Sequence, residues 1–465
     1  EIINAAYLGL KSSLQENAKL PKELLQNGLR PMLMNLSDHK KLTLSGLEAL
    51  AKLLELLISY FRVEIGKKLL DHLMAWAQIN TLRQIASQEL ENNHTVQIVM
   101  AILNIFHLLP AKAYTFMEDI IGTLQYLEGH LDRHQNSPFR IPVSKFLNRF
   151  PENCLEYYMK NFKNRKLGNM LASFAGIENC DKIREVTKTK IEEIYEDVKQ
   201  EADDKVRVVK FANLVDLLES LSERETEWFK GQKDLLSKVL GLLDKVVILQ
   251  DNSDLVSPAL FQSDQANHKF ELILVKFSKQ NNDIDLLFML VQKLFALKVT
   301  IPNEIEDYFF EDIITSDDVN HREIHLNKAL DFVSKEDCTL KAKNYVYQKL
   351  ISAILLGEIQ KHGNADAFFS EESPEWMNKI CNHIWRSTTT DIVTDHTSGK
   401  LDSHRFQLLE LTSILLKWCS KNIEGYKKDI IKFSWNYIKL EDNITKQAAY
   451  VTTTYFISAF EIPAK

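Results

Sequence analysis

The chain has 465 residues, of which 45% are apolar and 26% are charged. This composition supplies enough apolar surface for a folded core and excludes an intrinsically disordered chain. The formal net charge is −7, and the stretch 301–318 alone holds seven acids without any Lys or Arg. Because the rest of the chain is nearly balanced, it lacks the basic surplus that sequence-independent binding to nucleic acid requires. We therefore expect no direct nucleic-acid partner and no polybasic membrane binding.

Cysteine usage and hydropathy indicate a reducing compartment and no membrane span. The five cysteines are odd in number, widely separated and never arranged as C-x-x-C, which favours free thiols. The apolar run at residues 286–291 has six members, far fewer than the roughly 18 that a spanning helix needs. The sequence starts without Met and without a signal pattern. We interpret it as an internal piece of a longer chain or a trimmed form of one.

The first well-defined element is a helix that starts near residue 45. The motif Ser45-Gly-Leu-Glu48 fits a capping box, in which the Ser hydroxyl and the Glu side chain each satisfy a free N–H of the first turn. An apolar stripe follows at spacings of three and four, typical of one helix face: Leu47, Leu50, Leu54, Leu57 and Phe61. We expect Leu50 and Leu54 to pack between neighbouring repeats.

The same apolar period returns along the chain, in stripes within residues 96–106, 116–127, 208–218 and 408–418. Short polar breaks separate such stripes, and successive helix centres are about 20 residues apart, so a helical pair occupies about 40 residues, the period of HEAT-type repeats. The chain has only 14 Gly and 10 Pro, fewer turn residues than a strand-rich fold needs. The sequence predicts an all-α, HEAT-like α-solenoid of antiparallel helical hairpins that forms a curved superhelix.

Three segments interrupt this rhythm. The two prolines of Ser137–Val143 predict a turn between helical blocks. Residues 249–258 have the character of a linker, and Arg386–Lys400 is predicted to form a polar loop. We therefore expect helical repeats at 1–136, 137–249 and 259–465, with the loop at 386–400, all in one continuous solenoid segment. The Thr-rich and aromatic stretch 448–460 has strand propensity, but the helical context favours a helix.

No motif of a known enzyme class is present. The chain lacks both glycine-rich phosphate-binding motifs, the H-R-D and D-F-G elements of kinases, and the G-x-S-x-G elbow of hydrolases. We therefore expect no catalytic residue, no nucleotide or other cofactor and no small-molecule substrate.

Three histidine arrangements have part of the pattern of a metal site. The pairs His321/His325 and His130/His134 have the i,i+4 spacing of zinc ligands on a helix. Neither pair has the H-E-x-x-H pattern, in which the Glu beside the first His acts as general base. Residues 381 and 383, a Cys and a His, lack a second half-site nearby. We expect surface histidines and no bound metal.

Two segments have the character of interaction sites. Residues 157–166 interleave aromatics with four cations, which suits base stacking and phosphate contact. We favour a structural role, with a core stripe at 154, 155, 158 and 162 and the cations at a helix C-terminus, although such a basic rim could receive an acidic peptide. The acidic run 301–318 resembles an acidic-hydrophobic interaction segment. A repeat helix that begins at Pro302 and keeps its aromatics inward is the favoured alternative.

Residues Leu29–Leu73 carry a family resemblance. The segment L-R-P-M-L-M-N-L-S-D-H-K-K-L-T, followed by L-L-E-L-L and I-G-K-K-L-L-D-H-L, resembles the HEAT-repeat region of the TRRAP-type pseudokinases in their fungal form. These are long, catalytically inactive members of the phosphoinositide-kinase-related kinase family. The resemblance implies a nuclear, non-catalytic scaffold segment of a SAGA-type transcription coactivator. Its implied partners are coactivator-complex subunits and acidic transcription activators. The resemblance transfers no catalytic or activator-contact residue.

A transport or adaptor solenoid of the karyopherin kind is the alternative. Such a protein would also be helical and acidic, with cargo bound on a concave surface lined by regularly placed Trp and Asn. The six tryptophans do not recur at a repeat period, which disfavours this alternative: Trp76, Trp228, Trp376, Trp385, Trp418 and Trp435.

Overall fold

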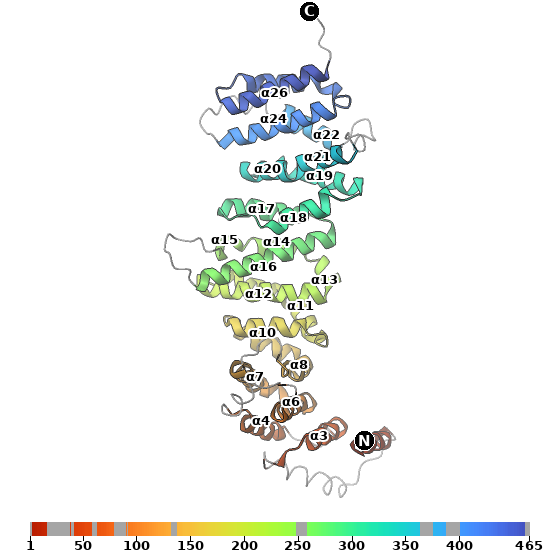
Figure 1. Ribbon diagram of the computed structural model, residues 1–465. Helices are drawn as coiled ribbons and strands as arrows, with labels where there is room; N and C mark the ends of the chain where they lie inside the picture. Colours follow the sequence, from red (N-terminus) through yellow and green to blue (C-terminus); the bar gives the residue numbers. More distant parts are fainter. Residues whose placement is uncertain are drawn as a thin grey trace, which may run out of the picture. The chain divides into compact units, whose positions relative to one another are not determined.

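The computed structural model describes residues 2–15, 38, 41–57, 63–78, 90, 92–131, 137–247, 258–362, 375–386 and 400–460. Every regular element in these ranges is a helix, and none is a strand. The all-α prediction is confirmed. The chain divides into unit 1, residues 1–229 and 250–266, and unit 2, residues 230–249 and 267–465. Within each unit, Figure 1 shows the helices stacked in chain order.

Unit 1 is built from antiparallel helices with two short 3-10 segments between them. Its elements are α1 (Ile2–Gln15), α3 (Leu44–Leu57), α4 (Glu64–Trp76), α6 (His94–Ile105), η3 (Phe106–Leu108), η4 (Ala111–Phe116), α7 (Met117–Leu131), α8 (Arg140–Arg149), α9 (Pro151–Lys160), α10 (Arg165–Gly176), α11 (Asp181–Gln200) and α12 (Asp204–Arg224). The helices α13 (Thr226–Lys230) and α16 (Pro258–Asn281) contain points of division between the units.

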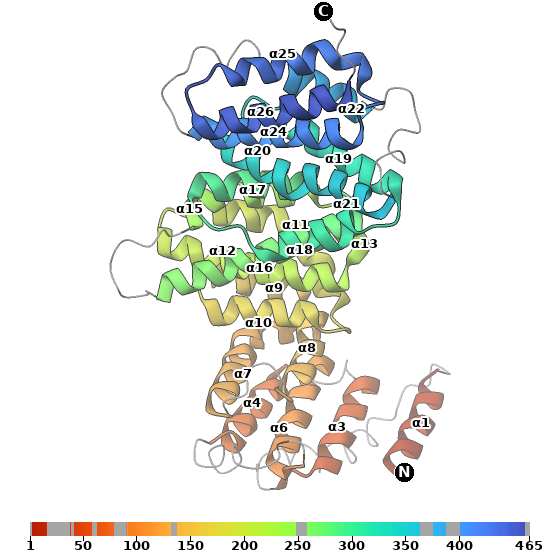
Figure 2. The ribbon, with the colours of Figure 1, turned by 45° about the horizontal axis from the view of Figure 1, so that its top comes forward.

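Unit 2 differs by containing three π-helical segments, η5 (Phe309–Ile314), η6 (Tyr347–Ile351) and η8 (Cys381–Arg386). Its other elements are α14 (Lys233–Leu240), α15 (Leu243–Val246), α17 (Asp285–Leu297), α18 (Asn303–Tyr308), α19 (Val319–Val333), α20 (Leu340–Val346), α21 (Ser352–His362), α22 (Glu375–Ile380), α24 (Lys400–Trp418), η9 (Glu424–Tyr426), α25 (Lys427–Ile438) and α26 (Asn443–Ala459). Helix α26 packs against α24 and α25, as Figure 2 shows.

Side-chain bonds between corresponding helices reveal the repeat. Arg165 bonds to Asn213, 48 residues away. The ammonium group of Lys349 bonds to Glu306, 43 residues away, and that of Lys379 bonds to Asp331, 48 residues away. The helical pairs are therefore somewhat longer than the predicted repeat of about 40 residues, but their succession is that of a HEAT-like solenoid.

The start of α3 corrects the predicted capping box. The Thr43 hydroxyl accepts the hydrogen bond from the Gly46 N–H at 3.1 Å, so Thr43 is the capping residue and Ser45 lies inside the helix. A Thr hydroxyl accepts such a bond as a Ser hydroxyl does, and Thr43 comes first along the chain. The prediction of a helix here is correct, but its cap lies two residues earlier.

The predicted apolar stripes form the core. Leu47, Leu50 and Leu54 are at most 3% exposed, and α3 packs against α6. The predicted packing role of Leu50 and Leu54 thus agrees with their burial. The side chain of Leu57 and all of Phe61 lie outside the described residues. Trp418, the last residue of the predicted stripe within 408–418, is 40% exposed at the end of α24, so its predicted place in the core is wrong.

The predicted interruptions have mixed outcomes. Pro138 and Phe139 form a turn directly before α8, as predicted, and Pro142 lies in the first turn of α8, where its missing N–H leaves no helical bond unmade. Stretch 448–460 lies mostly in α26, so the helix prediction is confirmed. Residues 248–257 and 387–399, which hold most of the predicted linker and loop, are outside the described ranges. The division at 136, 249 and 259 stays a prediction.

Candidate partner-binding grooves

A groove opens in unit 1 between α7, α8 and α10, with a cavity volume of about 500 Å³. We call it the polar groove. Nine residues line it: Gln125, Glu128 and Gly129 from α7, Arg140 from α8, and Asn164, Arg165, Lys166, Asn169 and Met170 at the start of α10. Three of the nine are cations and one is an acid. The lining therefore favours an anionic partner.

A buried ion pair forms one wall of the polar groove. Arg140 donates from Nε and Nη2 to the two carboxylate oxygens of Glu128, at 2.8 and 3.0 Å. The Nη1 group of Arg140 donates to the Ser173 hydroxyl. A two-point contact of this kind fixes both side chains. The pair therefore holds α8 against α7 and gives the groove a rigid wall.

The opposite wall is the start of α10, which is held by α12. A Cβ atom at Gly168 would lie 2.0 Å from Cγ of Asn213, so only glycine permits this close approach of the two helices. Arg165 Nη1 forms an ion pair with Asp216 Oδ2 at 2.5 Å and donates to Asn213 Oδ1 at 2.8 Å. The neighbouring Lys166 is exposed and has no ion-pair partner among the described residues. Among the described cations that line the groove, Lys166 is therefore the one without a carboxylate partner.

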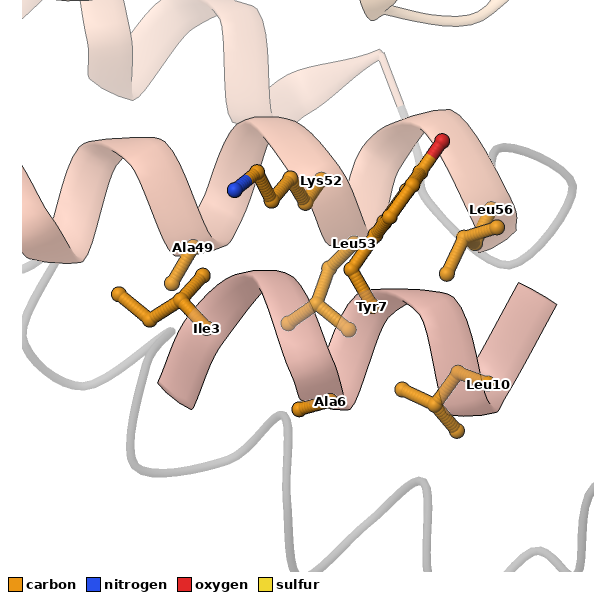
Figure 3. Close-up of a pocket in the computed structure, with 8 residues that line it drawn as sticks. All are labelled: Ile3, Ala6, Tyr7, Leu10, Ala49, Lys52, Leu53 and Leu56. Carbon is orange, nitrogen blue, oxygen red and sulfur yellow. The ribbon is translucent and has the colours of Figure 1, made fainter. Parts of the chain in front are cut away.

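A second groove, which we call the apolar groove, lies between α1 and α3 and has a volume of about 210 Å³. Figure 3 shows that its lining comes from both helices: Ile3, Ala6, Tyr7, Leu10, Ala49, Lys52, Leu53 and Leu56. At its edge the Tyr7 hydroxyl donates to Glu55 Oε1 at 2.8 Å. The lining offers apolar contact but few polar groups for specific recognition.

The expectation of surface histidines is wrong for His325. His325 is fully buried, and its Nδ1 lies 2.8 Å from the carbonyl oxygen of His321. Burial lowers the pKa of His325 to about 4, so this imidazole is neutral at pH 7. His130 Nδ1 is similarly close to the Tyr126 carbonyl, and His134 lies outside the described ranges. No group of three or more potential ligand side chains occurs among the described residues.

The Cys–His motif and the other thiols are also accounted for structurally. Cys381 is buried, whereas His383 is exposed on the same π-helical segment, so the two side chains face different environments. All five cysteines lie in the described part of the chain and are buried free thiols. Burial raises the pKa of Cys338 to about 11, which makes its thiolate scarce at neutral pH. No described helix is long and apolar enough to cross a membrane.

The aromatic and basic segment 157–166 is mainly structural, as favoured from the sequence. Tyr158 and Phe162 are 1% exposed and belong to the core. The placement of the cations at one helix end is partly wrong. Lys160 ends α9, but Arg165 and Lys166 open α10. The helix breaks at 161–164, where the Asn164 side chain caps α10.

The acidic run 301–318 forms a helix that starts after Pro302, as expected, with acids in its first turn. Tyr308 and Phe309 point into the core, but Phe310 is 60% exposed, so the prediction that all aromatics face inward is wrong. The tryptophans vary from fully buried Trp376 to Trp435, which is 55% exposed. They do not form a common surface ladder.

Sequence reasoning identified only one side of the polar groove. The segment 157–166 predicts a basic rim, and two of its cations do line the groove. The partners on α7 and α8 were missed. One signal was available, because Glu128 follows Leu124 by four residues and thus falls on the buried face of its helix. A Glu at such a position requires a cation from elsewhere.

The stacked helical pairs and the side-chain bonds between successive pairs define an α-helical repeat protein of the HEAT type. A family model of the Tra1 HEAT repeat ring region matches residues 1–465. The chain belongs to this family.

Curated relatives extend the comparison. The chain is 37% identical over its full length to the Saccharomyces cerevisiae protein named SAGA complex/NuA4 acetyltransferase complex subunit TRA1, and covers 12% of that protein. It is 30% identical to the corresponding Schizosaccharomyces pombe subunit, with the same coverage. Identity to the probable transcription-associated protein 1 of Dictyostelium discoideum is 26%, with 10% of that protein covered. The chain thus spans about one eighth or less of these relatives.

Proposed function

We propose that this chain is a scaffold segment of a large transcription coactivator subunit that links transcription activators to histone acetyltransferase complexes of the SAGA type. The observation that carries the proposal is the family match over all 465 residues. It is supported by relatives named as SAGA and NuA4 subunits. The segment presents surface and performs no chemistry, acts in the nucleus, and contacts other complex subunits and acidic activators. It binds neither nucleic acid nor a cofactor.

The architecture suits such a role. In a repeat protein each helical pair contacts mainly its neighbours, so a long chain can display many separate surfaces without a single central core. The bonds from Arg165 to α12 and from Lys349 to α18 are examples of contacts that join successive pairs. Coupled pairs within one unit can hold bound proteins at defined separations on that unit.

The test uses the full-length parent protein with an affinity tag at a terminus. We expect purified material to contain histone acetyltransferase subunits and to acetylate histone peptides. Recovery of cargo that dissociates with Ran-GTP, without acetyltransferase subunits, would instead establish a transport solenoid.

Activator contact is tested separately. An acidic activator carrying a photoreactive amino acid is crosslinked to the intact complex, and the crosslinked residues are mapped by mass spectrometry. The proposal requires crosslinks within residues 1–465. If all crosslinks lie elsewhere in the parent protein, the activator-binding part of the proposal is wrong, while the scaffold part is judged by the first experiment.

A further inference from the structure

The polar groove has three features that together define the chemistry of an occupant. The first is charge. Arg140 is neutralised by Glu128 and Arg165 is paired with Asp216, so Lys166 supplies the unneutralised charge. Since the amide groups at the start of α10 are already capped by Asn164, recognition of an anion falls to side chains.

The second feature is a set of carboxamides. Gln125 on α7 and Asn169 on α10 both line the groove, and Asn169 Nδ2 also donates to Asp216 at 3.4 Å. A carboxamide both donates and accepts hydrogen bonds, so it can pair with the N–H and C=O groups of a peptide backbone. Only an extended backbone leaves those groups available, because a helix uses them internally.

The third feature is Gly129, a glycine of α7 that exposes helix backbone to the groove. A Cβ atom at Gly129 would meet no heavy atom within 4 Å, and Gly129 lines the groove. Glycine inside a helix costs roughly 0.5–1 kcal/mol relative to alanine, and here no packing contact requires it. Because Gly129 has no side chain, the backbone of another chain could approach this part of α7 closely.

From these features we infer that the polar groove binds an extended acidic peptide segment of a partner protein. Lys166 contacts the partner's carboxylates, and Gln125 and Asn169 bond to its main chain. Nucleic acid fits less well, since none of the nine lining residues is aromatic and single-stranded nucleic acid depends on stacking. The inference rests on the proposed function, in that an acidic activator is one such partner.

The experiment measures the fluorescence anisotropy of a labelled Asp-Ser repeat peptide that is titrated with the purified full-length parent protein. The Asn-Ser repeat peptide and an oligothymidylate are the comparison probes. We expect the Asp-Ser peptide to bind and both comparison probes to bind about tenfold more weakly or worse. Binding should weaken with added salt. No binding of the Asp-Ser peptide, or equal binding of the oligothymidylate, would overturn the inference.

Two pairs of variants localise the contact. Lys166→Glu is matched by Lys163→Glu, which reverses an exposed cation outside the groove. Gly129→Glu is matched by Gly122→Glu, which adds the same charge one heptad earlier on α7, also where a Cβ meets nothing within 4 Å. We expect about tenfold weaker binding for the groove variant of each pair and little change for its control. Equal losses in all four variants would show that net charge alone attracts the peptide, which would overturn the inference.

Failure of this test is distinguishable from failure of the proposed function. Co-purification with acetyltransferase subunits does not depend on the peptide probe. A chain that assembles correctly but does not bind the peptide would retain the scaffold function and lose only this groove as a site.

Discussion

Each unit contains a buried arginine–glutamate pair that joins two of its helices, but the surroundings of the two pairs differ. In unit 1, Arg140 and Glu128 line the polar groove, and their side chains are 8% and 2% exposed. In unit 2, Arg322 Nη2 lies 2.5 Å from Glu358 Oε2, and these side chains are 2% and 0% exposed. A lost partner leaves a buried charge in both cases. The comparison teaches that the cost depends on whether water can then reach that charge.

The largest effect is expected for Arg322→Met. The substitution removes the Arg322 cation from beside the fully buried Glu358 carboxylate. Breaking a buried ion pair in this way typically lowers the free energy of unfolding by about 3–5 kcal/mol. We expect hydrogen exchange to show that α19 and α21 open more easily by this amount. The double variant Arg322→Met/Glu358→Leu, which removes both charges, should recover most of the loss. A loss below about 1 kcal/mol in the single variant would mean that Glu358 is readily hydrated.

Arg140→Met should have a smaller effect. Glu128 is 2% exposed while Arg140 is in place, but it lines the polar groove. Once the guanidinium is removed, water from the groove can reach the carboxylate, so we expect the free energy of unfolding to fall by about 1–3 kcal/mol. The measurement is again hydrogen exchange, here on α7 and α8. A loss as large as that of Arg322→Met would contradict the difference between the two surroundings.

Glu271 extends the comparison to a buried acid without an arginine. Its Oε2 lies 3.6 Å from His268 Nδ1, and His268 Nε2 lies 3.6 Å from Glu304. Burial, with a smaller effect of Glu304, raises the pKa of Glu271 from 4.5 to about 8. Between pH 4.5 and about 8 the Glu271 carboxyl therefore stays protonated in the folded state and is ionised in the unfolded chain. The stability that Glu271 contributes is fully present below pH 4.5 and is lost as the pH rises towards 8.

Glu271→Gln tests this assignment. The amide has no charge to bury, so the variant should melt near the parent temperature at pH 5 and above it at pH 8. Because the carboxyl pKa is raised from 4.5 to about 8, we expect a gain in the free energy of unfolding of about 3–4 kcal/mol at pH 8. Thermal unfolding across this pH range gives the answer. A variant less stable than the parent at pH 8 would show that Glu271 is stabilised as a carboxylate.

The repeat fold could be predicted because its main determinant is local. Apolar residues at spacings of three and four specify a helix and its buried face wherever they occur. The pairing of Arg165 with Asp216 could not be predicted in this way. These residues are 51 positions apart, and the alignment of one helical pair on the next is fixed by contacts such as that of Gly168 with Asn213. One side of the polar groove was therefore visible in the sequence and the other was not.

Local helix geometry also limited the prediction. The expectation that all aromatics of 301–318 face inward ignored the turn of about 100° between consecutive side chains of a helix, because of which Tyr308, Phe309 and Phe310 cannot share one face. The structure also has a π-helical segment from residue 309, in which the bonds run from residue i to i+5. Tyr308 and Phe309 face the core and Phe310 faces solvent. Periodicity at three and four does not reveal such a change of helix type.

The smallest predicted effect compares the glycine beside each glutamate. Gly129 follows Glu128, and a Cβ atom added there would have no heavy atom within 4 Å, whereas at Gly357, which precedes Glu358, a Cβ would lie 3.3 Å from Cγ2 of Ile314. Gly129→Ala should therefore gain about 0.5–1 kcal/mol from reduced backbone freedom in the unfolded chain. Gly357→Ala should gain less, because the Ile314 methyl group must move to accept the added one. Differential scanning calorimetry of the two variants measures both effects. Equal gains would show that the Ile314 methyl group accommodates the added one at no cost, and the expected difference between the two glycines would be wrong.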